Sequence, residues 1–272
     1  VKSILFYKMK TIYYYQTFVG LQHLFSHVQD IDVINISSIH FDEDKHGQKN
    51  IYLNDNLPTN PMFDQMWEEC EHLHNQGPII MLMVGGAGLA YQQLFKDFDI
   101  YYPQLKQLLQ NKTFIGGIDL DIEEEVSIDS VKMLIRKLKE DFGKDFLLSM
   151  APVAPSLMHD GGSMGGFSYK ELFASEEGPL IAWFNVQCYG FFTKRIYDAI
   201  IKNGYPPEKV VMGMLSEQFD KTNFKEALDE VKSILEEYPY MGGVFDWEYF
   251  NAPPVINDPS AWCKLMKMIT VY

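Results

Sequence analysis

The chain has few cysteines and contains no long hydrophobic run. Three of its 272 residues are cysteines, and Cys70, Cys188 and Cys263 lie far apart, which matches neither a metal-binding spacing nor a disulfide framework. No segment approaches the roughly 18 apolar residues of a membrane-spanning helix, and no polybasic amphipathic stretch is present. We therefore expect no membrane partner, no metal and no other cofactor.

Basic residues are also scarce. The chain has 23 Lys plus Arg against 37 Asp plus Glu, a formal net charge of -14, and such a surface repels nucleic acid. A composition of 47% hydrophobic and 22% charged residues is that of an ordinary globular protein. No signal peptide is visible in the chain as given, which leans to a cytoplasmic location, although a leader removed before Val1 stays open.

Short β-rich apolar runs alternate with stretches of helical periodicity, and this alternation predicts parallel βα units. The eight predicted strands are Thr11–Tyr15, Val33–Ser38, Ile79–Val84, Phe114–Ile122, Phe146–Met150, Trp183–Cys188, Val210–Met214 and Gly243–Trp247. The predicted helices are Gln16–His27, Pro61–His74, Leu89–Leu109, Ser127–Phe142, Tyr169–Ala174, Phe191–Asn203, Asn223–Tyr238 and Pro259–Thr270. This pattern favours one (β/α)8 TIM barrel over residues 1–272. A doubly wound sheet, the alternative, would need a glycine-rich phosphate turn that the early strands lack.

Two predicted loops are long, His40–Asn60 after the second strand and Ala151–Ser168 after the fifth. In a barrel both would rise from the C-terminal face, where active sites form. Only one helix fits between the last two strands, so we expect no large α+β insertion and an open, shallow groove.

The fourth predicted strand carries an alternating row of acids. Asp119, Asp121 and Glu123 share one face, and Ile118, Leu120 and Ile122 share the other. Because the aliphatic face must pack against helices, the acids should point into the barrel. At a spacing of about 6–7 Å, two such charges repel by roughly 2–3 kcal/mol, which raises the proton affinity of one carboxyl as a general acid requires. A metal site or a solvated strand end remains an alternative to acid/base chemistry.

The segment Gly116–Glu123 resembles the DxxDxDxE signature of glycoside hydrolase family 18, which contains chitinases and endo-β-N-acetylglucosaminidases. Four further segments resemble motifs of this family, in the expected order: Val84–Gly86, Ser149–Pro152, Asn185–Tyr189 and Gly243–Trp247. The first Asp of the signature is replaced by Gly116, which brings the proton relay and the rate into question more than the reaction itself.

The resemblance implies a role for each residue. Glu123 would be the acid and base, Asp121 would hold the substrate's acetamido group, and Asp119 would share charge or a proton with Asp121. Tyr189 would donate its hydroxyl to the acetamido oxygen, and Trp247 would form the floor under the sugar.

Other groove residues follow less directly. The resemblance places Gly86 beside the substrate. Gln187 could reach the site or make a structural hydrogen bond, and Met150 and Met214 could line the groove or simply fill the barrel.

We therefore expect a retaining hydrolase of β-1,4-linked N-acetylglucosamine, in chitin or chito-oligosaccharides, that uses substrate-assisted catalysis. The predicted fold and motifs are most like the compact plant and fungal branch of the family. The alternatives are an endo-β-N-acetylglucosaminidase acting on the chitobiose core of N-glycans, and a non-catalytic lectin. The oligomeric state stays open.

Overall fold

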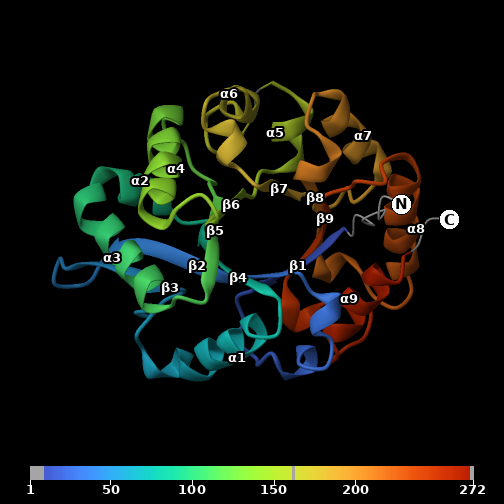
Figure 1. The fold of residues 1–272 in the computed structure, drawn as a ribbon, viewed down its shortest axis with the longest axis horizontal. Coiled ribbons are helices and arrows are strands. Elements are labelled where there is room, and N and C mark those ends of the chain that lie inside the picture. Colours follow the sequence, from blue (N-terminus) through green and yellow to red (C-terminus); the bar gives the residue numbers. More distant parts are fainter. Residues whose placement is uncertain (1–8, 161–162, 270–272) are drawn as a thin grey trace, which may run out of the picture.

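The computed structural model describes residues 9–160 and 163–269 and contains a closed barrel of eight parallel strands ringed by helices (Figure 1). The barrel strands are β1 (Lys10–Tyr15), β2 (Val33–Glu43), β4 (Ile79–Gly85), β5 (Ile115–Asp121), β6 (Leu147–Met150), β7 (Trp183–Gln187), β8 (Val210–Leu215) and β9 (Gly243–Trp247). Each strand pairs in parallel with its neighbours along the chain, and the pairing of β1 with both β2 and β9 closes the ring. The predicted TIM barrel is confirmed.

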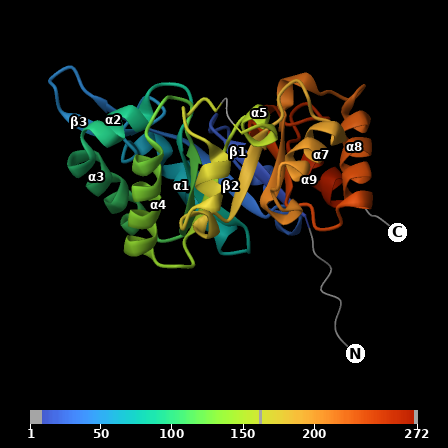
Figure 2. The same ribbon diagram turned by 90° about the horizontal axis from the view of Figure 1, so that it is seen from above.

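Helices surround the strands on the outside of the barrel (Figures 1 and 2). They are α1 (Asp64–His74), α2 (Ala90–Lys96), α3 (Phe98–Asn111), α4 (Ile128–Phe142), α5 (Ala154–Met158), α6 (Tyr169–Ala174), α7 (Lys194–Lys202), α8 (Phe224–Glu237) and α9 (Ser260–Lys267). Between β8 and β9 the chain holds α8 and a short 3₁₀ turn, so the expected lack of an α+β insertion is confirmed. Thr270, the predicted end of the last helix, lies outside the described residues.

The predicted helix Gln16–His27 is wrong, because the only helical turn in this segment is the 3₁₀ turn Gln22–Leu24, and a second 3₁₀ turn, Val28–Asp30, follows it. Side chains bind backbone N–H groups that a helix over this segment would use, and Gly20 has φ +100°, outside the helical region. The hydroxyl of Tyr15 accepts from the N–H of Gly20, and Glu69 accepts from the N–H of Leu21. Tertiary partners therefore override the local helical periodicity.

Three further predictions need correction. The predicted loop Ala151–Ser168 holds the short helix α5 (Ala154–Met158). The helix Leu89–Leu109 is two helices, because Asp97 has φ −128° and ψ 46° and interrupts the α conformation. The loop His40–Asn60 holds an antiparallel hairpin in which β2 continues to Glu43 and pairs with β3 (Lys49–Leu53). The hairpin projects from one side of the barrel (Figures 1 and 2).

The barrel strands separate two apolar cores. The outer core lies between strands and helices and contains Ile118, Leu120 and Ile122. The inner core fills the lumen and consists of Ile12, Tyr14, Val33, Met81, Met83, Trp183, Val211 and Phe245. The predicted alternation along β5 is therefore confirmed on its aliphatic side, and it leaves the acidic side facing the lumen.

Candidate active site

Asp119 lies deepest in the lumen and is completely buried. Its Oδ2 accepts a hydrogen bond from the hydroxyl of Tyr14 at 2.7 Å. Its Oδ1 accepts from the hydroxyl of Ser149 at 2.6 Å and from the amide of Asn185 at 2.9 Å. Burial raises the pKa of Asp119, although these three donors oppose the rise. Both oxygens therefore have partners within the protein.

Asp121 is the next carboxyl along the row, and it is less well satisfied. It is 5% exposed and lines the pocket, and its Oδ1 accepts from Nε2 of Gln187 at 3.1 Å. Burial, followed by the negative charges of Glu123 and Asp119, raises the pKa of Asp121 well above its ordinary range. The folded site therefore favours a proton on this carboxyl.

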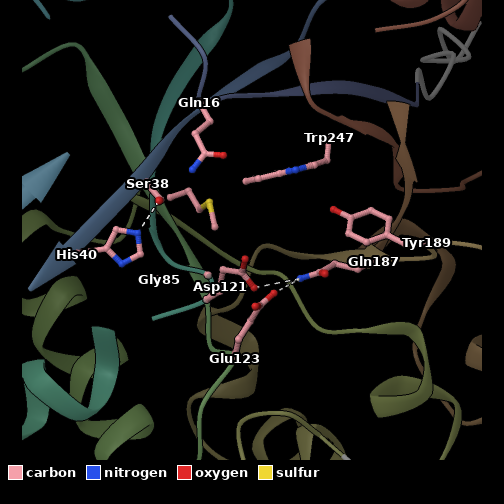
Figure 3. A pocket seen from close by; sticks show the side chains of 12 residues that line it. Gln16, Ser38, His40, Gly85, Asp121, Glu123, Gln187, Tyr189 and Trp247 are labelled. Atoms are coloured by element: carbon pink, nitrogen blue, oxygen red, sulfur yellow. Dashed lines mark hydrogen bonds between the residues drawn. The ribbon is translucent and has the colours of Figure 1, made fainter. Parts of the chain in front are cut away.

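Gln187 joins Asp121 to Glu123. Besides Asp121, its Nε2 lies 3.3 Å from Oε1 of Glu123 and 2.9 Å from the carbonyl oxygen of Ala151. Glu123 is half-buried at the pocket wall, two residues beyond the end of β5. One amide group thus fixes the two carboxyls relative to each other (Figure 3).

These side chains border a pocket of about 320 Å³ at the C-terminal end of the barrel (Figure 3). It is lined by Gln16, Ser38, His40, Met83, Gly85, Gly86, Ala87, Asp121, Glu123, Gln187, Tyr189 and Trp247. Tyr189 and Trp247 lie on the same side as Gln187, and the Trp247 ring packs 5.3 Å from that of Tyr14. Burial, and then the charge of Asp121, raises the pKa of the Tyr189 hydroxyl, so it is a hydrogen-bond donor at neutral pH.

Glycines let the backbone after β4 approach the acids. A Cβ on Gly85, whose φ is +104°, would lie 2.1 Å from the carbonyl oxygen of Asp121. A Cβ on Gly86 would lie 3.7 Å from Oδ2 of Asp121 and 3.1 Å from the Met83 side chain. Side chains at these two positions would therefore displace the strand or enter the pocket.

Met150 and Met214 do not line the pocket. Both are completely buried in the outer core, and the indole N–H of Trp262 lies 3.0 Å from the sulfur of Met214. The strand period explains the correction, because Ser149 faces the lumen and its neighbour Met150 must face the helices. Cys188 likewise lies in the outer core, where burial raises the pKa of its thiol to about 12.

Sequence reasoning did not single out Gln16, Ser38 or His40, which form the pocket side opposite Gln187 and Tyr189 (Figure 3). The ring nitrogen Nε2 of His40 lies 2.7 Å from the hydroxyl of Ser38. The spacing of the polar residues Ser38 and His40, two positions apart, does place them on one face of a strand. The predicted strand Val33–Ser38 ends before His40, however, so this spacing indicates a shared face only if the strand continues past Ser38.

Glu124 is a second residue that sequence reasoning did not single out. Its carboxylate is buried directly after Glu123 and accepts hydrogen bonds from the backbone N–H groups of Tyr91 and Gln92 in the first turn of α2. Burial raises its pKa despite these donors. Glu124 thus fastens the segment that carries Glu123 to the helix that follows the Gly85–Gly86 turn.

Residues 9–160 and 163–269 contain no group of three or more His, Cys, Asp or Glu side chains arranged to hold a metal ion. Within the same residues no helix is long and apolar enough to cross a membrane.

Comparisons with known proteins agree with this geometry. The family model for glycosyl hydrolases family 18 matches residues 9–247, whereas a search of curated proteins gave no match. A solved fungal endo-β-N-acetylglucosaminidase of glycosyl hydrolase family 18 is 31% identical, with a TM-score of 0.83, over 96% of this chain and 97% of that chain.

A second solved structure is equally similar. The chitinase ChiC from Aspergillus fumigatus is 32% identical, with a TM-score of 0.82, over 96% of this chain and 99% of that chain. A chitinase from Pseudoalteromonas aurantia, at 20% identity and a TM-score of 0.71, shares the fold. The family match over residues 9–247, together with these two neighbours above 30% identity, shows that the chain belongs to glycosyl hydrolase family 18 and is a glycosidase.

Proposed function

We propose that the chain hydrolyses β-1,4-linked N-acetylglucosamine oligomers with retention, and that the substrate's own acetamido group is the nucleophile. The observation that carries this proposal is the amide of Gln187, which holds Asp121 and Glu123 together on the wall of one pocket. Most retaining glycosidases use a second carboxylate as nucleophile, and this family is an exception.

In the first step the acetamido oxygen attacks the anomeric carbon, and the bond from that carbon to the glycosidic oxygen breaks. Glu123 gives its proton to the departing oxygen. Asp121 accepts the acetamido N–H, and Tyr189 donates its hydroxyl to the acetamido oxygen. The pKa of Asp121 is raised by burial and by its acidic neighbours, so Asp119 would share a proton or the negative charge with it as the cyclic cation forms.

In the second step Glu123 takes a proton from water, which attacks the anomeric carbon on the face that the first leaving group occupied. The acetamido oxygen leaves, and the ring closed in the first step reopens. Two inversions give overall retention, and Trp247 offers a flat apolar surface for the sugar ring throughout.

Replacing Glu123 tests the assignment directly. Glu123→Gln should lower kcat on chitotetraose by about 10²–10⁴-fold, the range for a positioned acid/base. The matched control is Glu125→Gln, which changes an exposed carboxyl in the same segment and should leave kcat unchanged. Full activity of Glu123→Gln would refute the assignment of the acid, and a wild-type chain that binds chitotetraose without cleaving it would refute the enzymatic proposal in favour of a lectin.

The anomeric form of the first product tests the nucleophile. Substrate assistance predicts that NMR recorded during the reaction shows the β-anomer first. An initial α-anomer would contradict it.

Endo-β-N-acetylglucosaminidase activity on N-glycan cores is a second candidate, favoured by the 31% identity to the solved fungal enzyme of that activity. The same residues would carry out the reaction. Release of glycan from a high-mannose glycopeptide, measured beside chitotetraose cleavage at equal enzyme concentration, separates the two substrates.

A further inference from the structure

A second pocket adjoins the catalytic one. It has a volume of about 440 Å³ and is lined by Gln16, Thr17, His40, Asn54 and Asp55. We call it the hairpin pocket, because His40, Asn54 and Asp55 come from the β2–β3 hairpin and the turn that follows it. It shares Gln16 and His40 with the catalytic pocket, so a chain of sugars can run from one into the other.

The hairpin pocket is held in shape by hydrogen bonds. Oδ1 of Asn54 accepts from the N–H of Ser38 at 3.2 Å, and Nδ2 of Asn54 donates to the carbonyl oxygen of Gln16 at 3.1 Å. Oε2 of Glu248 accepts from the N–H groups of Gln16 and Thr17 at 2.7 and 2.9 Å. A ligand therefore meets walls that are already formed, which lowers the entropic cost of binding.

The chemistry of this pocket differs from that of its neighbour. Among the described residues, its lining contains no tyrosine, tryptophan, phenylalanine or aliphatic side chain, so most of the contacts that it offers to a sugar are polar. Burial lowers the pKa of His40 and outweighs the opposing effect of Asp55, so the imidazole is neutral at pH 7. Asp55 is then the one charged lining residue, and in the described part of the chain no lysine or arginine pairs with it.

We propose that the hairpin pocket is a subsite for a glucosamine unit with a free ammonium group, next to the N-acetylglucosamine that is cleaved. This inference rests on the proposed function and narrows its substrate class to partly deacetylated chitin. The reaction requires an acetamido group only beside Asp121 and Tyr189. In the hairpin pocket an ammonium gains a charge-assisted hydrogen bond to Asp55, whereas an acetamido methyl meets a lining that is mostly polar.

The net charge of the whole molecule also favours binding of an oligomer that carries an ammonium group. A net charge of -14 attracts a cationic oligomer over a long range and raises its rate of encounter. The test must therefore separate the local effect of Asp55 from this general attraction.

Ground-state binding measures the subsite without depending on turnover. Calorimetry on the Glu123→Gln variant would compare chitotetraose with its four isomers that carry one glucosamine each. We expect at least one isomer to have a Kd about threefold to fivefold lower than chitotetraose at low salt, as for an exposed ion pair. That ratio should approach one at about 0.5 M NaCl, where such pairs are screened.

Two double variants, each with a second substitution added to Glu123→Gln, identify the residue that causes the preference for the glucosamine isomer. Adding Asp55→Asn to Glu123→Gln should abolish it, whereas adding Asp42→Asn, which removes an exposed charge from the same hairpin outside both pockets, should keep it. The inference fails if no isomer binds more tightly than chitotetraose, or if Asp42→Asn removes the preference as fully as Asp55→Asn. Failure of the wild type to cleave chitotetraose would count against the proposed function alone, because the Kd comparison needs no cleavage.

Discussion

The two walls of the catalytic pocket are built in different ways. The strand wall consists of Asp121, Glu123, Gln187, Tyr189 and Trp247, which project from β5, β7 and β9 or lie within two residues of their ends. The barrel itself positions these side chains.

The hairpin wall, opposite, consists of Gln16, Ser38 and His40 in the catalytic pocket, and it continues into the hairpin pocket as Asn54 and Asp55. It comes from the segment after β1 and from the β2–β3 hairpin, and it is held by bonds from side chains to backbone. This difference fits our proposals that the strand wall performs the chemistry and that the hairpin wall selects the neighbouring sugar.

The largest expected effect is on the strand wall. Asp121→Asn should lower kcat on chitotetraose on the order of 10²–10³-fold, as for the loss of one preorganised electrostatic contact, with a smaller change in KM. Steady-state kinetics at pH 7 provide the measurement. A loss of less than tenfold would remove Asp121 from the chemistry and would break the division between the walls.

The same variant should be more heat-stable than the wild type. The carboxyl of Asp121 has a raised pKa when folded and ionises near pH ~4 when unfolded. The folded state therefore retains a proton that the unfolded chain releases, and the contribution of Asp121 to wild-type stability falls as the pH rises above about 4. Asparagine removes this fall, so the Tm advantage of Asp121→Asn should grow between about pH 4 and pH 7. A Tm difference that does not change with pH would contradict the raised pKa.

An intermediate effect is expected on the hairpin wall. Asn54 has φ 52°, so Asn54→Gly keeps the backbone conformation and removes only the three side-chain bonds, one to Ser38 and two to Gln16. Loss of these three bonds should raise KM for chitotetraose by about threefold to tenfold and leave kcat nearly unchanged. Asn50→Gly, at a half-buried site of the same hairpin that lines neither pocket, is the control. A fall in kcat as large as the rise in KM would show that the two walls are not separable.

The smallest effect is expected at Gly116, where this chain departs from the family signature. A Cβ there would lie 3.4 Å from Ile79, which is ordinary contact, and both oxygens of Asp119 already have hydrogen-bond donors. Gly116→Asp should therefore change kcat/KM by less than about threefold across the pH–rate profile, because it adds no missing partner. A gain of tenfold or more would mean that the missing carboxylate limits the strand wall.

The strand wall could be predicted from sequence because one rule positions it. Side chains alternate along β5, which is enough to place Asp119, Asp121 and Glu123 inside the barrel, and the family resemblance adds Gly86, Gln187, Tyr189 and Trp247. The same alternation places Met150 on the outer face of the barrel, because its neighbour Ser149 faces the lumen. The reactions assigned to these residues remain predictions.

The hairpin wall could not be predicted because its contacts join remote parts of the chain. Thr17 is held by Glu248, 231 residues away, and the N–H of Leu21, which the helix expected over Gln16–His27 would use, is held by Glu69, 48 residues away. No local periodicity records such a bond.

The amide of Asn54 links the turn after β3 to Gln16 in the segment after β1, while the reacting groups stand on the barrel. Such an arrangement lets evolution or an engineer exchange the tip of the β2–β3 hairpin and the turn after it for residues of different composition, and so change the sugar preference, while the barrel part of β2 and the reaction centre stay intact. The sugar preference of the protein can thus change without any change in its catalytic residues.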